Sequence, residues 1–172
     1  MHRLFCLRRS IRKYTSKVPS EEQVRQILLA AMVAPSANSL YPVEFIVVRN
    51  QKTIKLLSLC GQHQAFLASS PIVIVIVADP TKSPKMWLID ASLAASHIYL
   101  EATNQGLATC WANVHLGVRP DGSDREDYVR KLLNIPVNKK PVCIMSLGFP
   151  AETKPSHDEN DFRPNQIHQE KW

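Results

Sequence analysis

Helix-like and strand-like patterns alternate along this chain, and residues that cap or break helices stand between them. From Val24 onward, apolar residues recur at helical spacing, which predicts a helix that runs to about Val33. Ser20 is a suitable N-cap for this helix, and Gln23 can reach back to it in a capping box. Pro35 follows the predicted end, where a proline stops helical structure.

Runs of β-branched and other apolar residues predict the strands. The strongest is Pro71–Ala78 (PIVIVIVA), whose lack of polar alternation predicts burial on both faces. Val43–Arg49 and Pro141–Leu147 are further strand predictions, and the second leads into Gly148. Leu107–Val114 has the composition of a short strand or an extended turn.

A long helix is predicted at Met86–Asn104, where alanines and serines would let another helix approach closely. Shorter helices or helical turns are predicted at Met1–Leu7, Thr53–Leu59, Gln64–Ser69 and Asp124–Leu133. The sequence contains no internal repeat, linker or low-complexity segment. It therefore predicts one domain of mixed α and β structure, built in layers, over residues 1–172.

Charge and cysteine usage narrow the classes of function. The chain has 21 lysines and arginines against 15 acidic residues, and its formal charge of +6 favours an anionic ligand or partner. The four cysteines are dispersed, without CxxC spacing and without a histidine pair at metal-ligand spacing. We expect separate reduced thiols and no metal site.

Several cations cluster in Arg8–Thr15 (RRSIRKYT), which suggests an export signal, a nucleic-acid arm or a pocket for a small anion. An export signal needs an apolar stretch after its basic region, whereas Tyr14–Glu22 is polar. No apolar run approaches the ~20 residues that span a bilayer, so we expect a cytoplasmic protein without membrane contact. Nucleic acid is the least favoured partner, because the other cations are scattered near acids, as in Asp124–Asp127.

The number and spacing of the glycines limit how the protein could bind a phosphorylated ligand. There are five, and no two lie close together, so the sequence contains neither a Rossmann fingerprint nor a P-loop. Cationic side chains must then bind any phosphate. The planar donor fork of arginine suits this task, and Ser10 adds a hydroxyl within the basic cluster. A solvated basic surface is the alternative on charge content alone.

The order of these motifs resembles the nitroreductase family of FMN-dependent flavoproteins. The resemblance starts with RRSIRKYT, a capped helix and APSANSLYPVEFIVV. It continues through FLASSPIVIVIVADP, NQGLATCWANV, VCIMSLGFPAE and the closing RPNQIHQEKW, in the family's order over nearly the whole chain. It implies an α+β fold, a three-layer αβα sandwich around a central, mostly antiparallel sheet.

The same resemblance implies roles for particular residues. Arg8 and Ser10 would contact the FMN phosphate, with Arg9 contributing backbone or charge, and Arg163 would return to that phosphate. Arg12 would lie near the N1–C2=O edge of the flavin, where a fixed cation stabilises the charge of the reduced ring. Further cofactor contacts are implied at the turn Pro35, Ser36, Ala37, Asn38 and Ser39, at Ala112, Asn113 and Val114 beside flavin N5, and at Gly148 near the ribityl chain.

The implied function is an FMN-dependent oxidoreductase that passes hydride from NADH or NADPH through flavin N5 to nitroaromatic, quinone or similar acceptors. The implied assembly is a homodimer with FMN at the subunit interface, and the turn at Pro35–Ser39 often serves the second subunit's cofactor. No other catalytic residue is implied, because the chemistry belongs to the flavin. Two alternatives stay open: a family relative with another reaction, such as dehalogenation or flavin breakdown, and a non-catalytic flavin- or anion-binding module.

The turn departs from the family's pattern. Ser39 occupies the family's asparagine position, and Tyr41 and Val43 replace its usual glutamine and tryptophan. We expect a comparatively open substrate site, or one covered mainly by the region from Val114 to Asp124. His115 is the one histidine expected near the flavin, and Cys110 is expected to be a buried structural thiol. Asp90 is expected either to pair across a dimer or to lie on a solvated helix face.

Overall fold

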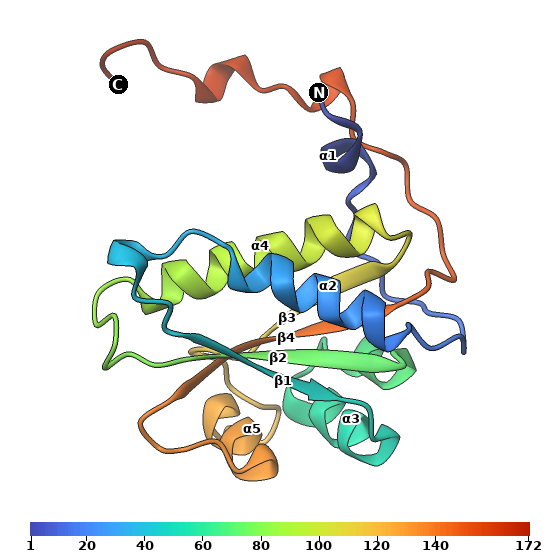
Figure 1. The fold of residues 1–172 in the computed structure, drawn as a ribbon, viewed down its shortest axis with the longest axis vertical. Helices are drawn as coiled ribbons and strands as arrows, with labels where there is room; N and C mark the ends of the chain where they lie inside the picture. The colour runs from blue at the N-terminus through green and yellow to red at the C-terminus, as the bar shows by residue number, and fades with distance from the viewer.

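The computed structural model describes residues 1–172 and has a four-stranded antiparallel sheet at its centre (Figure 1). The strands lie in the order β1–β2–β4–β3, so β1 and β3 form the two edges. Their bounds are Val43–Val48 for β1, Ile72–Ala78 for β2, Ala108–Asn113 for β3 and Lys140–Gly148 for β4. Since β3 is an edge strand, its outer side is open to other parts of the chain.

Helices cover both faces of the sheet (Figure 1). On one face lie α2 (Glu21–Met32) and α4 (Trp87–Asn104), and on the other lie α3 (Gln51–Leu57) and α5 (Arg125–Leu133). This arrangement confirms the predicted α+β fold with three layers and an antiparallel sheet. No helix is long and apolar enough to cross a membrane.

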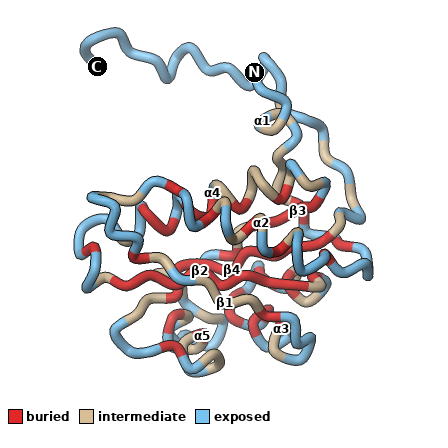
Figure 2. The backbone as a smooth tube through the Cα atoms, in the orientation of Figure 1, coloured by how far each residue is buried: buried red, intermediate tan, exposed pale blue.

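The core consists of two apolar clusters, one on each side of the sheet. β2 is wholly buried, as its sequence predicts. Its isoleucines Ile72, Ile74 and Ile76 pack with α2 and α4, while the valines between them pack with α3 and α5. The inner faces of the helices and the central strands are accordingly the buried parts of the backbone (Figure 2).

Local capping explains most of the helix boundaries. Ser20 caps α2 in a full capping box with Gln23, as predicted. The helix predicted at Thr53–Leu59 starts earlier, at Gln51, because the Asn50 side chain accepts hydrogen bonds from two N–H groups of the first turn. Gln64–Ser69 yields a short 3₁₀ segment, η3 (Ala65–Ser69).

The two ends of the chain lie together, away from the layered body (Figures 1 and 2). The short helix α1 (Arg3–Leu7) has no buried residue, and residues 158–172 are exposed throughout. Within this tail, two 3₁₀ turns form: η4 (Glu159–Asp161) and η5 (Pro164–Gln166).

Candidate functional site

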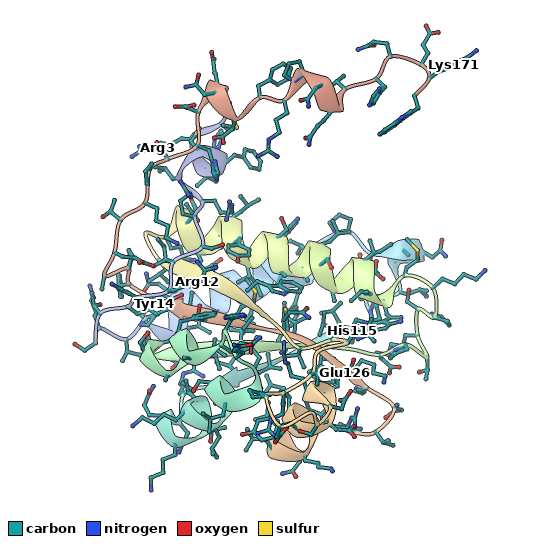
Figure 3. The ribbon with its side chains drawn as sticks, turned by 180° about the vertical axis from the view of Figure 1, so that it is seen from behind. Arg3, Arg12, Tyr14, His115, Glu126 and Lys171 are labelled. Carbon is teal, nitrogen blue, oxygen red and sulfur yellow. The ribbon has the colours of Figure 1, made fainter.

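The basic segment, residues 8–15, runs along the outer side of β3. Ser10 forms a parallel bridge with Thr109, and the Ile11 N–H donates to the Thr109 carbonyl at 3.3 Å. The open edge of the sheet thus aligns a segment that has no strand pattern of its own. Figure 3 shows Arg12 and Tyr14 at this edge.

The other side of the basic segment pairs antiparallel with the chain that follows β4. Four hydrogen bonds connect the two: Thr15 N–H to Phe149 O (2.9 Å), Ala151 N–H to Lys13 O (2.9 Å), Arg12 N–H to a Glu152 carboxylate oxygen (2.6 Å) and Lys154 Nζ to Ser10 O (2.6 Å). The backbone of the segment is therefore fixed on both sides, which leaves its cationic side chains to serve a ligand.

The arginines of the segment spread over both sides of the β3 edge. The Arg8 guanidinium lies 5.4 Å from the ring centre of Tyr99 on α4, whereas that of Arg12 lies 5.8 Å from the ring of Phe66 in η3. Arg9 donates to the Pro155 carbonyl. A groove beside α4 is lined by Arg8, Ser92, Ala95, Ser96, Tyr99 and Trp111. It combines one cation, three hydroxyls and two aromatic rings.

Backbone groups of β3 also point to this outer side. The Trp111 N–H donates to the Tyr99 hydroxyl at 2.7 Å, and the Asn113 carbonyl accepts from Gln64 (3.0 Å) and Arg125 (2.8 Å). Because strand residues alternate, the Asn113 N–H faces the same way. The Val114 N–H instead donates to Val142 O at 3.0 Å. Of the implied Ala112–Val114 contacts, Asn113 is the one whose N–H lies on the open edge.

Two neighbouring residues at the start of α5 hold the loop that follows β3. Arg125 bonds the carbonyls of Asn113 and Val118, each at 2.8 Å. Glu126 accepts from the Leu116 N–H at 3.0 Å and from Nδ1 of His115 at 2.7 Å. Figure 3 shows His115 and Glu126 next to each other. Hydrogen bonds to α5 thus fix the region from Val114 to Asp124, which was one of the two expectations for a substrate cover.

The Glu126 carboxylate is almost fully buried, which was not foreseen for a run of charged residues. Burial by itself raises the pKa of a carboxyl group. Here the Leu116 N–H, His115 and Lys140, whose Nζ lies 3.3 Å from the carboxylate, outweigh it, so the pKa of Glu126 lies below its ordinary value. The edge of the His115 ring meets the ring of Trp87, with 5.0 Å between centres. His115 is therefore held on two sides.

The turn after α2 is strained and anchored by Asp90. Asn38, Ser39 and Tyr41 all have positive φ, at 51°, 55° and 45°. Such conformations cost free energy in residues other than glycine, and they cluster at functional sites. Asp90 Oδ1 accepts from the Ala37 N–H at 3.0 Å, and Oδ2 accepts from the hydroxyls of Ser36 and Ser83 at 3.3 Å each.

Asp90 is buried, so the expectation of a solvated helix face is wrong, whereas its pairing across a dimer stays a prediction. The turn that it anchors lies at one end of α4, whereas α1 and the basic segment lie at the other end (Figure 1). The implied cofactor residues consequently form two groups within one chain: the β3 edge, with Arg8–Arg12 and Ala112–Val114, and the separate turn at Pro35–Ser39.

Gly148 and Arg163, the two remaining residues for which the resemblance implied cofactor contacts, belong to neither group. Gly148 is buried, and a Cβ there would lie 2.8 Å from Cδ of Pro71 and 3.0 Å from the Tyr14 ring. Its lack of a side chain therefore serves close packing. Arg163 precedes η5 in the exposed tail, where its side chain makes no hydrogen bond or ion pair. The tail residue that reaches Arg8 is His157, with Nε2 at 3.3 Å from the guanidinium.

Tyr14 has a structural role that no sequence pattern indicates. Its buried hydroxyl donates to the Ile11 carbonyl and lies within hydrogen-bond distance of the Ser146 hydroxyl on β4. Burial raises the pKa of Tyr14 above its ordinary value. Cys110 is buried as expected, and burial likewise raises the pKa of its thiol. Tyr14 therefore locks the basic segment onto the sheet.

Comparison with known proteins decides the family. The sequence profile of the nitroreductase family matches residues 7–63 and 56–149. The chain belongs to the nitroreductase family. A putative NADH dehydrogenase/NAD(P)H nitroreductase from Archaeoglobus fulgidus is 38% identical over 99% of this chain and 97% of its own length. A protein of the same description from Methanothermobacter thermautotrophicus is 36% identical over 96% of this chain and 84% of its own.

A solved nitroreductase supports the same conclusion. The FMN-dependent nitroreductase of Clostridium difficile R20291 superimposes with a TM-score of 0.95 at 36% identity, over 98% of both chains. The family resemblance of the sequence is thus confirmed. The prediction of an enzyme family that uses FMN and NAD(P)H is confirmed at the level of the family.

Proposed function

We propose that the chain is an FMN-dependent oxidoreductase that uses NADH or NADPH to reduce acceptors of the nitroaromatic and quinone class. The observation that carries the proposal is the basic segment, fixed by backbone bonds on both sides along the open edge of β3. When bound, FMN supplies hydride chemistry at its N5. The chain's own residues anchor, orient and polarise it.

The donor set of the β3 edge fits this cofactor. Arg8 and the Ser10 hydroxyl, both beside Tyr99, would hold the phosphate. Arginine–phosphate bonds are charge-assisted and need no glycine-rich loop. Arg12, in the middle of the segment and beside Phe66, would place its positive charge at the N1–C2=O edge.

The Asn113 N–H would lie beside N5, because it faces the same edge as the basic segment. The loop after β3 would cover the ring on this side, held by Arg125 and Glu126. Asn113 and the loop thus orient the ring, while Arg12 stabilises its negative charge. These roles require no acid–base dyad.

The active assembly would be a homodimer with two interface sites. The implied turn at Pro35–Ser39 lies away from the β3 edge of its own chain, which fits a contribution to the cofactor site of a second copy. Apolar side chains on the outer face of α4, Leu88, Ile89 and Leu93, are partly exposed, and Trp172 in the tail is fully exposed. A second copy would cover such surfaces.

Anaerobic titration of the FMN-loaded protein tests the proposal. We expect NADH or NADPH to bleach the flavin absorbance, and a quinone or nitroaromatic to restore it. A protein that cannot be loaded with FMN, or whose flavin neither nucleotide bleaches, overturns the proposal and favours a non-catalytic module. Bleaching without restoration by either acceptor indicates a relative with another reaction.

A further inference from the structure

His157 and Asp161 form a polar pair beside Arg8, at the N-terminal end of the basic segment. None of the cofactor-binding roles proposed above uses this pair. Nε2 of His157 lies 3.3 Å from NH2 of Arg8, and Nδ1 lies 2.8 Å from Oδ2 of Asp161. The His157 N–H donates to the Cys6 carbonyl at 2.9 Å. The imidazole thus bridges the tail and the residue that would carry the phosphate.

The chemistry of the three groups fixes the direction of both bonds. A guanidinium has donors only, so Nε2 of His157 must accept from Arg8. The ring proton then sits on Nδ1 and is donated to Asp161, whose carboxylate can only accept. The hydrogen bond to His157 and a second one from the Asp158 N–H lower the pKa of Asp161. The neutral imidazole with this tautomer directs one edge of the Arg8 guanidinium toward the tail.

We propose that His157, held by Asp161, is a positioning residue for Arg8 and so strengthens the binding of the flavin's phosphate specifically. This inference rests on the proposed function. With one guanidinium nitrogen bound to His157 and its central carbon 5.4 Å from the ring centre of Tyr99, Arg8 would keep its remaining donors available to the anion. A free arginine would lose side-chain entropy on binding, and a preorganised one loses less.

Paired measurements with FMN and riboflavin test this role, because the two ligands share the ring system and differ in the phosphate. We expect His157→Leu to weaken FMN binding about tenfold, measured by quenching of flavin fluorescence. Riboflavin binding should stay within about twofold of wild type. His157→Gln, whose amide oxygen can accept from Arg8, should restore most of the affinity for FMN. Asp161→Asn should weaken FMN binding about threefold, again without an effect on riboflavin.

His168→Leu is the matched control, since this second tail histidine stacks on Trp172 instead of contacting Arg8. Thermal unfolding of the ligand-free variants establishes that they fold. If His157→Leu does not fold, His157→Gln and Asp161→Asn carry the test. Unchanged FMN affinity, or equal losses for FMN and riboflavin, overturns the role of His157. If wild type itself does not prefer FMN to riboflavin, the proposed function fails instead.

Discussion

Glu126 is a buried carboxylate that binds groups from two other parts of the chain. It connects α5 to the loop after β3, through His115 and Leu116, and to β4 through Lys140. Leu116 has a positive φ of 53° and is 82% exposed, so its backbone is strained without a packing contact to compensate. The carboxylate therefore holds the loop in place.

We expect Glu126→Gln to destabilise the protein by about 1–3 kcal/mol at pH 7, because the buried network loses its negative charge and one of its two acceptor oxygens. The pKa of Glu126 is lowered in the folded state, so its contribution is present above its ordinary pKa and lost as the pH falls through the folded value. Chemical denaturation at several pH values should show the difference between the two proteins shrinking as the pH falls below the ordinary pKa of a glutamate, about 4.3. A constant difference down to pH 3 would contradict this account, and the exposed Glu159→Gln serves as control.

At the scale of elements, the N-terminal part of α4 and the turn after α2 form one unit through Asp90. Three hydrogen bonds from the turn and from Ser83 converge on this carboxylate. They hold the backbone of Asn38, Ser39 and Tyr41 in conformations that are otherwise unfavourable.

Replacement of Asp90 by Ala should release the turn. We expect a loss of about 2–3 kcal/mol in unfolding free energy, since buried hydroxyls and an N–H lose their partner. Amide hydrogen exchange at residues 36–41 should become faster, while exchange in β2 tracks global stability only. Ser92→Ala, on an exposed part of the same helix, is the control. Unchanged exchange in the turn would show that other contacts hold it.

Elements with local signals were predictable, and contacts between distant segments were not. Ser20 and Gln23 predict the start of α2, and the unbroken β-branched run of β2 predicts burial on both faces. No local pattern shows that the basic segment pairs with the chain after β4, since that register depends on Tyr14 and Gly148 meeting across the sheet. The charged residues Asp90 and Glu126 are a further case, because their sequence context does not show that both are buried.

The candidate site was predictable to a similar extent. The family resemblance led to Arg8, Arg12 and the segment around Asn113, which the fold brings to one edge. It could not indicate His157, because a histidine in a polar tail has no sequence signal for a contact with Arg8. Arg163, which the resemblance implied at the phosphate, stays a prediction.

At the scale of the whole molecule, α4 presents an outer face whose apolar residues lack a partner within the chain. Ile89 is 51% exposed on this face. We expect Ile89→Lys to convert the proposed dimer into monomers and to weaken FMN binding at the same time, because the turn of the second copy would leave the site. Light scattering after gel filtration measures the first effect. Val137→Lys, at an exposed valine in the loop between α5 and β4, should change neither. A monomeric wild type that binds FMN tightly would contradict the dimer.

In the proposed function, the basic segment on the β3 edge holds the phosphate of FMN. The most direct measurement compares the dissociation constants of FMN and riboflavin for wild type, Arg8→Ala and Arg25→Ala, the last removing an exposed arginine paired with Glu22. We expect wild type and Arg25→Ala to prefer FMN clearly. Arg8→Ala should bind FMN roughly ten- to a hundredfold more weakly, with riboflavin affinity nearly unchanged. An Arg8→Ala variant that keeps the full preference for FMN would contradict the account.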